Sequence, residues 1–113
     1  MEYKVFFINR KVKNDTLKFP KGILANFIHI TEMIEEFGLS LGKPYISKVE
    51  KELFEIRAKG AEGIGRSFFC TSKNKEIIIL HSYIKKTQKI PQKEIKIARK
   101  RLKEYKNEKR VVE

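Results

Sequence analysis

The sequence is poor in the residues that cross-link small folds. It contains one cysteine, two histidines, three prolines and no tryptophan among 113 residues. The lone Cys70 cannot form a disulfide within the chain, and with two histidines it makes too small a ligand set for a structural zinc site. We therefore expect no metal, no cofactor and a reducing, cytoplasmic environment.

Long apolar runs are also missing from the sequence. No stretch approaches the roughly 18 apolar residues that a membrane-spanning helix requires. The opening residues, MEYKVFFINRK, lack the extended apolar region of a signal peptide. We therefore expect a soluble, intracellular protein.

Positive charge is what the sequence has in excess, with a formal net charge of +12. Residues 73–113 carry 14 Lys and Arg against 5 Asp and Glu, whereas residues 1–72 carry 12 against 9. Such a basic segment attracts polyanions, and nucleic acid is the leading candidate. Two other interpretations stay open: a solvated helix face, and an anionic membrane surface.

Length and composition predict one domain over residues 1–113, since about 100 residues is a common domain size. Residues 3–8 favour a strand that ends in a polar turn over residues 9–15. A helix follows between Pro20 and a cap at Gly38, because apolar residues recur there every three or four positions. These apolar residues are Ile23, Phe27, Ile30, Ile34 and Phe37.

The second half of the chain favours strands and then a basic helix. Residues 53–57 form the first predicted strand, and a glycine-rich loop, KGAEGIG, separates it from a strand over residues 66–71. A further strand is predicted over residues 76–86. The closing helix starts near Pro91, and residues 107–113 are expected to fray. Its packed stripe is Ile95, Ala98, Leu102 and Tyr105.

The strand over residues 76–86 changes from apolar to titratable along its length. Strict alternation puts its odd-numbered residues on one face. A polar end on a buried strand costs free energy unless it meets a site or solvent. We therefore expect this face to open into a cleft with His81, Tyr83 and Lys85 at the mouth. The odd-numbered residues are Ile77, Ile79, His81, Tyr83 and Lys85.

Three stretches resemble the HigB group of the RelE/ParE toxin superfamily, the toxins of bacterial type II toxin–antitoxin systems. They are GKPYISKVEKELFEIR, GRSFF and LHSYIKKTQKIPQKEIKIARKRLKEY. The resemblance implies an α+β fold: a small, twisted, mainly antiparallel sheet with an N-terminal helix packed on it and a C-terminal basic helix. It also implies ribosome-dependent mRNA cleavage, and silencing by a cognate antitoxin that is usually a helix-turn-helix, HigA-like protein. The complex is then expected to bind operator DNA through the antitoxin.

Cleaving RNA without a metal requires three tasks of the protein. It must help remove the ribose 2′-hydroxyl proton, stabilise charge on the phosphate and protonate the leaving 5′-oxygen. Arg57 and Arg66 are candidate phosphate clamps because a guanidinium matches two phosphate oxygens. His81 and Lys85 are candidates for proton transfer. The resemblance places the family's catalytic arginine at Arg66. It matches Arg57 to the arginine that ends the motif aromatic-Glu-aliphatic-Arg.

Several further residues are candidates for gripping RNA. Tyr83 can stack on a base. The resemblance pairs Lys86 with Lys85 as the basic pair after the last strand, and Lys86 is expected to contact the backbone. The remaining basic candidates are Lys89, Lys96, Arg99 and Lys103, with Lys106 on the same helical stripe as the last three.

Each assignment has a structural alternative. His81 can be a packed histidine and Tyr83 a core residue, and Arg57 can simply pair with Glu55 or Glu52. Several RelE-type nucleases carry a tyrosine near the start of the last helix, where this sequence has Pro91 to Glu94. The general base is therefore not identified from the sequence.

Two other functions fit the same pattern. A ParE-like inhibitor of DNA gyrase shares the fold without cleaving RNA, and it leaves His81 and Lys85 without a chemical task. A noncatalytic nucleic-acid-binding module needs only the charge.

Overall fold

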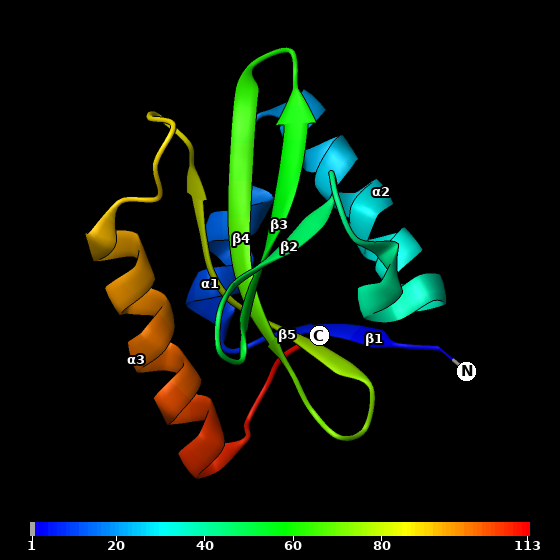
Figure 1. Ribbon diagram of the computed structural model, residues 1–113, viewed down its shortest axis with the longest axis vertical. Helices are drawn as coiled ribbons and strands as arrows, with labels where there is room; N and C mark the ends of the chain where they lie inside the picture. The colour runs from blue at the N-terminus through cyan, green and yellow to red at the C-terminus, as the bar shows by residue number, and fades with distance from the viewer. Residues whose placement is uncertain (1) are drawn as a thin grey trace.

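The computed structural model describes residues 2–113, which form a five-stranded sheet and three α-helices (Figure 1). The strands lie in the order β1-β5-β4-β3-β2. All neighbouring pairs are antiparallel except β1 and β5, which are parallel. In chain order the elements are β1 (Lys4–Phe7), α1 (Arg10–Leu17), α2 (Lys21–Phe37), a 3-10 turn (Gly38–Leu41), β2 (Ile46–Glu50), β3 (Leu53–Gly60), β4 (Gly63–Thr71), β5 (Glu76–Ile84) and α3 (Gln92–Glu108).

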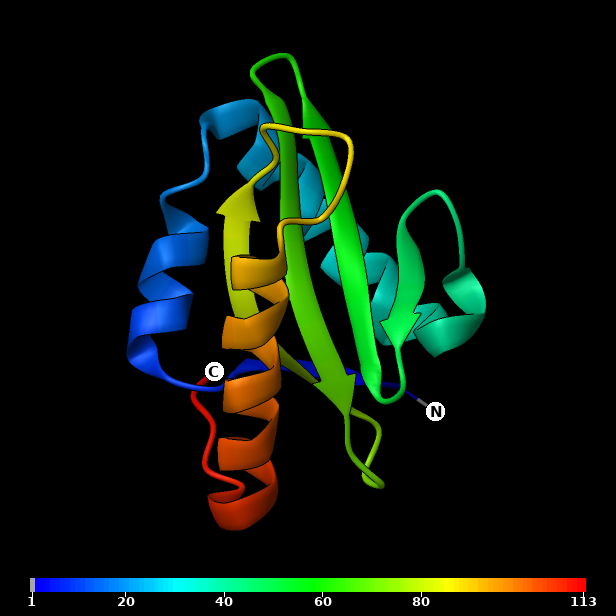
Figure 2. The same cartoon turned by 60° about the vertical axis from the view of Figure 1, so that its left-hand side comes forward.

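The helices divide between the two faces of the sheet. α1 and α2 cover one face, and α3 crosses the other, as turning the molecule shows (Figures 1 and 2). The expected α+β class with a mainly antiparallel sheet is thereby confirmed. Within residues 2–113 no helix is both long and apolar enough to span a bilayer.

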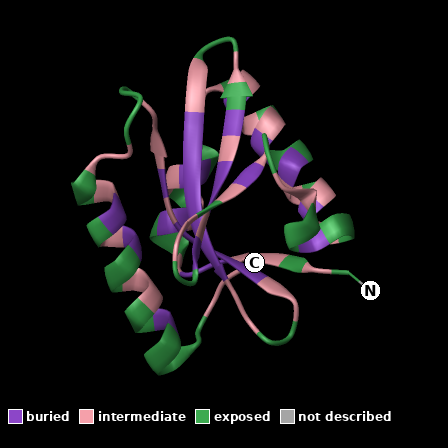
Figure 3. Cartoon of the chain, in the orientation of Figure 1, coloured by how far each residue is buried: buried purple, intermediate pink, exposed green. Residues whose placement is uncertain are grey.

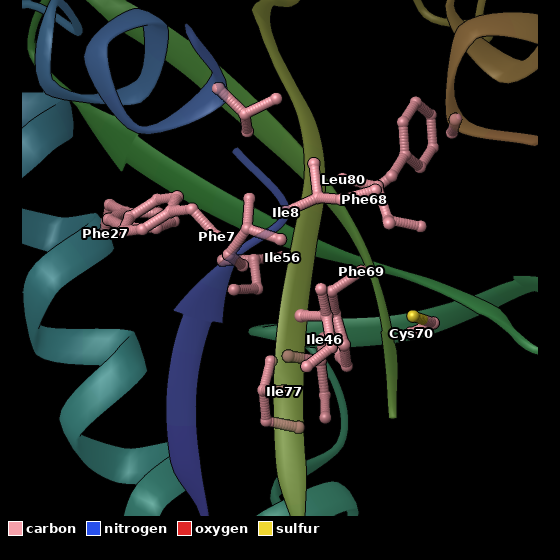
Figure 4. Close-up of a cluster of buried hydrophobic side chains, with 14 of the residues drawn as sticks. Phe7, Ile8, Phe27, Ile46, Ile56, Phe68, Phe69, Cys70, Ile77 and Leu80 are labelled. Carbon is pink, nitrogen blue, oxygen red and sulfur yellow. The ribbon is translucent and has the colours of Figure 1, made fainter. Parts of the chain in front are cut away.

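The predicted helix between Pro20 and Gly38 is confirmed as α2. Its apolar stripe is buried against the sheet, except that Phe37 is half exposed. Figure 4 shows Phe27 grouped with Phe7 and Ile56 between α2 and the sheet. Gly38 ends the helix at a φ of 61°, a conformation that glycine adopts without a steric penalty.

Three segments differ from the sequence prediction. The polar turn expected over residues 9–15 is helix α1, capped by the Asn9 side chain, which accepts a hydrogen bond from Val12 N. Val12 and Thr16, four residues apart, are buried and make this short helix amphipathic. The sequence analysis did not find β2. The tail expected to fray stays helical to Glu108, and Val112 then exchanges backbone hydrogen bonds with Phe7.

The expected glycine-rich loop between β3 and β4 is a tight hairpin, because both strands continue to Gly60 and Gly63. The first turn of α2 packs directly on this hairpin. A Cβ on Gly60 would lie 2.5 Å from the backbone nitrogen of Ile23, so only glycine fits there. The longer strands carry Arg57 and Arg66 well inside the sheet.

Strict alternation along β5 is wrong because the strand contains a bulge. Phe68 of β4 pairs with His81, but Phe69 pairs with Ile79, so Leu80 has no direct partner. An extra residue in one strand reverses which face the following side chains occupy. His81 and Tyr83 therefore lie on the α3 face, opposite to Ile77 and Ile79.

Candidate functional site

The sheet brings the candidate residues together in two neighbouring rows on the α3 face. Arg57 of β3 lies opposite Arg66 of β4, which lies opposite Tyr83 of β5. One step along, Phe68 separates Glu55 from His81 in the same way. Side chains directly opposite each other on antiparallel strands are close neighbours. Four residues that the sequence analysis selected from three strands, Arg57, Arg66, His81 and Tyr83, thus share one surface.

Arg66 is the most deeply placed cation of this surface. It is 7% exposed, and its Nη1 lies 3.2 and 3.4 Å from the two carboxylate oxygens of Glu55, which is equally buried. The Nε of Arg66 is buried with no hydrogen-bond partner among residues 2–113, and the same holds for the Tyr83 hydroxyl. Burial raises the pKa of Tyr83 to about 12. This part of the site therefore holds two buried hydrogen-bond donors on directly opposed residues.

Arg57 and Lys85 lie at the more open side of the rows. Neither has an ion pair within residues 2–113, so Arg57 does not pair with Glu55 or Glu52. Loss of hydration lowers the pKa of Lys85, and the charges of Arg66 and Arg57 lower it further. The backbone nitrogen of Lys85 donates to Ile64 O, which holds the end of the strand on β4. Three cations thus converge at one place.

His81 is held by the helix that crosses this face. Its Nε2 lies 2.6 Å from Glu94 Oε1, and its Nδ1 lies 3.2 Å from Arg101 Nη1. Burial lowers the pKa of His81 below its ordinary value, although Glu94 raises it. His81 stacks beside Phe68 and Tyr83, with ring centroids 6.4 and 5.8 Å away. Contacts on both ring nitrogens therefore fix the orientation of the ring.

The lowered pKa of His81 predicts a stability change with pH. The unfolded chain binds this proton near pH 6.5, whereas the folded protein binds it only at lower pH, so stability is lost as the pH falls below 6.5. We expect the drop in Tm between pH 7.5 and 5.5 to be smaller for His81→Gln than for the parent. His29→Gln alters an exposed histidine and should follow the parent. Identical pH dependence in all three proteins would contradict the prediction.

Apart from Arg101, the basic residues of α3 divide into two groups. Arg99 donates two hydrogen bonds of 2.8 Å to Glu50, and Lys106 pairs with Glu52, so both tie the helix to the β2–β3 turn. The other group lies on the outward side of the helix, which is exposed (Figure 3). No ion pair within residues 2–113 engages this lysine stripe, which consists of Lys93, Lys96, Lys100 and Lys103.

The loop between β5 and α3 extends the positive surface. Lys86 and Lys89 are exposed there, and the Thr87 hydroxyl donates to the backbone oxygen of Lys89. This loop lies at the same end of the sheet as the start of α3 (Figure 2). The loop therefore connects Lys85, just after β5, with the start of α3.

The remaining chemically active groups lie apart from this cluster. Cys70 is buried, and burial raises the pKa of its thiol to about 12. A hollow of about 630 Å³ includes Cys70 and Tyr105 in its lining, but not Arg57, Arg66 or His81. Across residues 2–113, no three His, Cys, Asp or Glu side chains are grouped closely enough to hold a metal ion.

Three charged residues of the site were not selected from the sequence. Glu55 alternates with Arg57 and so had to share its face, a signal that the strand pattern already contained. Glu94 and Arg101 are seven residues apart, two turns of α3, and therefore lie on one side of the helix. Their contact with His81 could not be predicted, because it depends on the bulge at Leu80 that places His81 on the α3 face.

Comparisons with known proteins agree with this architecture. A chain in the crystal structure of the archaeal RelE–RelB complex from Pyrococcus horikoshii OT3 superposes with a TM-score of 0.53. The two are 23% identical over 74% of this chain and 96% of that chain, which establishes a shared fold. No curated protein matches the sequence. The sequence model described as "Phage derived protein Gp49-like" matches residues 14–103, and the chain therefore belongs to the Gp49-like family.

Proposed function

We propose that this protein is a HigB-like toxin of a type II toxin–antitoxin system. Its activity is ribosome-dependent, metal-independent cleavage of mRNA. The observation that carries the proposal is the convergence of Arg57, Arg66 and Lys85 beside the His81–Glu94 pair. Cations and a proton-transfer group are the parts that attack by a ribose 2′-hydroxyl requires. The RelE-like fold supports the same conclusion.

Each side chain has a role in this reaction. Arg57 and Arg66 bind the scissile phosphate and stabilise the charge that grows on its oxygens. The unpartnered Nε of Arg66 supplies a donor that its ion pair with Glu55 leaves unused. Tyr83 stacks on or hydrogen-bonds the nucleotide, and His81 and Lys85 belong to the proton-transfer path. A Lys85 ammonium with a lowered pKa gives up a proton to a leaving oxygen more readily.

The proposed partners are the ribosome, its message and a cognate antitoxin. The solved relative comes from a RelE–RelB complex, which supports an antitoxin as the partner here. We propose a helix-turn-helix, HigA-like antitoxin, through which the complex binds operator DNA. Bacterial growth arrest relieved by co-expressing such a protein is the expected cellular behaviour.

Single-turnover cleavage on programmed ribosomes tests the reaction. We expect cuts in translated but not untranslated message, in the presence of chelator, with 2′,3′-cyclic phosphate ends. Ribosome integrity is checked by sedimentation under the same conditions. A protein that arrests growth but never cuts would instead be a gyrase inhibitor, and one that does neither a noncatalytic binding module.

The lysine stripe should contribute binding without sequence preference. Replacing Lys93, Lys96, Lys100 and Lys103 with glutamine should weaken RNA binding equally across sequences. It should also lower the slope of log affinity against log salt by about 0.7 for each phosphate that the protein no longer neutralises. Arg99 and Lys106 are tied to Glu50 and Glu52, so neutralising that pair should change the slope less. Fluorescence anisotropy with mixed-sequence single-stranded RNA measures the affinity and its salt dependence for both sets of variants. An unchanged slope would mean that the stripe does not contact RNA.

A further inference from the structure

His81 lies between two charged side chains whose chemistry determines which ring nitrogen carries the proton. Arg101 Nη1 lies 3.0 Å from Leu80 O and 3.2 Å from His81 Nδ1. A guanidinium has only donors and stays protonated in proteins, so Nδ1 must accept. The one proton of a neutral ring then sits on Nε2, which donates to Glu94 Oε1 at 2.6 Å.

Neither nitrogen of His81 therefore keeps a lone pair that faces the cleft. Glu94 does keep an acceptor: one of its oxygens takes the hydrogen bond from His81, and the other has no hydrogen bond within residues 2–113. Its side chain is 14% exposed and lies in the first turn of α3, where backbone N–H groups favour a negative charge. Glu94 bonds His81, which stacks on Tyr83, and Tyr83 lies opposite Arg66, so Glu94 lies beside the same row of residues.

We infer that Arg101 is a positioning residue that holds His81 as the neutral, Nε2-protonated ring and so makes Glu94 the proton acceptor of the cleft. This inference rests on the proposed nuclease function. The proton of the ribose 2′-hydroxyl moves to Glu94 as the 2′-oxygen bonds to phosphorus. The bond from phosphorus to the 5′-oxygen breaks, and that oxygen takes a proton from the Lys85 ammonium.

The charged groups around His81 determine whether each substitution raises or lowers the pKa of His81. Glu94 and Arg101 face it from α3, and Asp15 acts on it from α1. Burial lowers the pKa of His81 most, Arg101 lowers it further, and Glu94 and Asp15 raise it. Removing Arg101 should therefore raise the pKa of His81, and removing the charge of Glu94 should lower it.

NMR of the imidazole nitrogens tests the positioning role without any activity assay. His29→Gln leaves His81 as the sole histidine. At pH 7 we expect His81 to be protonated on Nε2 alone. Arg101→Met should give mixed tautomers and a raised pKa, Arg101→Lys should restore the parent signal, and Lys100→Met should change neither. A charged ring or an Nδ1-protonated ring in the His29→Gln protein overturns the inference.

The pH dependence of single-turnover cleavage tests the role of Glu94. We expect Glu94→Gln to cleave about a hundredfold more slowly than the parent, with a rate that depends less on pH. Glu104→Gln changes an exposed residue of the same helix and should match the parent. Thermal melts check folding, and Glu94→Asp, which keeps the charge but shortens its reach, is the second variant. Parent rates and profiles in both Glu94 variants overturn the inference.

The two tests separate the further inference from the proposed function. If the parent never cuts, the nuclease function and the role of Glu94 in it are both rejected. The NMR result alone decides whether Arg101 holds His81 as the Nε2-protonated tautomer.

Discussion

Replacing Arg66 with alanine should slow cleavage on programmed ribosomes by about a hundredfold or more, as removal of a preorganised charge donor typically does. Arg66 lies directly between Arg57 and Tyr83 in the sheet, and its buried Nε has no partner within residues 2–113. It is thus the cation whose position the fold fixes most firmly. RNA binding should fall less than rate, because Arg57 and Lys85 still attract phosphate.

The same substitution should also destabilise the protein, and the experiment must separate the two effects. Removing Arg66 leaves the Glu55 carboxylate buried without its ion-pair partner, which costs about 3–5 kcal/mol. Adding Glu55→Gln removes that unpaired charge, so the double variant should regain stability in thermal melts. It should not regain rate. A folded double variant that cuts at the parent rate would reject Arg66 as a phosphate ligand. The control is Arg10→Ala, which removes an exposed arginine of α1 and should cut at the parent rate.

Local pattern was enough to predict the elements that carry the site. The apolar spacing of α2 and the stripe of α3 follow directly from helical periodicity, and both stripes are buried except for Phe37 and the partly buried Leu102. Arg57 and Arg66 were predicted on consecutive strands separated by a glycine-rich loop. Their direct opposition depends on the hairpin turn being only Ala61 and Glu62. The segment KGAEGIG was predicted as a loop because it is rich in glycine. In the structure Gly60 instead allows a close backbone contact with α2.

The bulge at Leu80 marks where sequence reasoning had to fail. A bulge belongs to the pairing of two strands, and nothing within β5 alone records it. Alternation still grouped His81, Tyr83 and Lys85 correctly, since all three follow the bulge, but it assigned them to the wrong face of the sheet. The partners of His81 were missed for the same reason: which helix covers a face is a tertiary property. The charge of Glu55 was likewise taken for a surface charge.

Saturating antitoxin should abolish binding of the protein to ribosomes. With a net charge of +12, the free protein attracts any polyanion, and Arg57 and Lys85 have no ion pair within residues 2–113. We expect an acidic antitoxin segment to lie on or beside Arg57 and Lys85. Charge should accelerate its association, and buried apolar anchors should hold it in place.

Kinetics of complex formation can separate steering from anchoring. Replacing Arg57 and Lys85 with glutamine should slow antitoxin association most at low salt, because steering weakens as salt screens the charges. Dissociation should change less, since it depends on the anchors. Glutamine at Lys4 and Lys11, exposed and away from the cleft, removes equal charge and should slow association less. Ribosome binding that persists at saturating antitoxin would exclude a mechanism in which the antitoxin covers the cleft. Inhibition would then have to act by changing the shape of the site. In that case α3 and its contacts to His81 would be the element to examine.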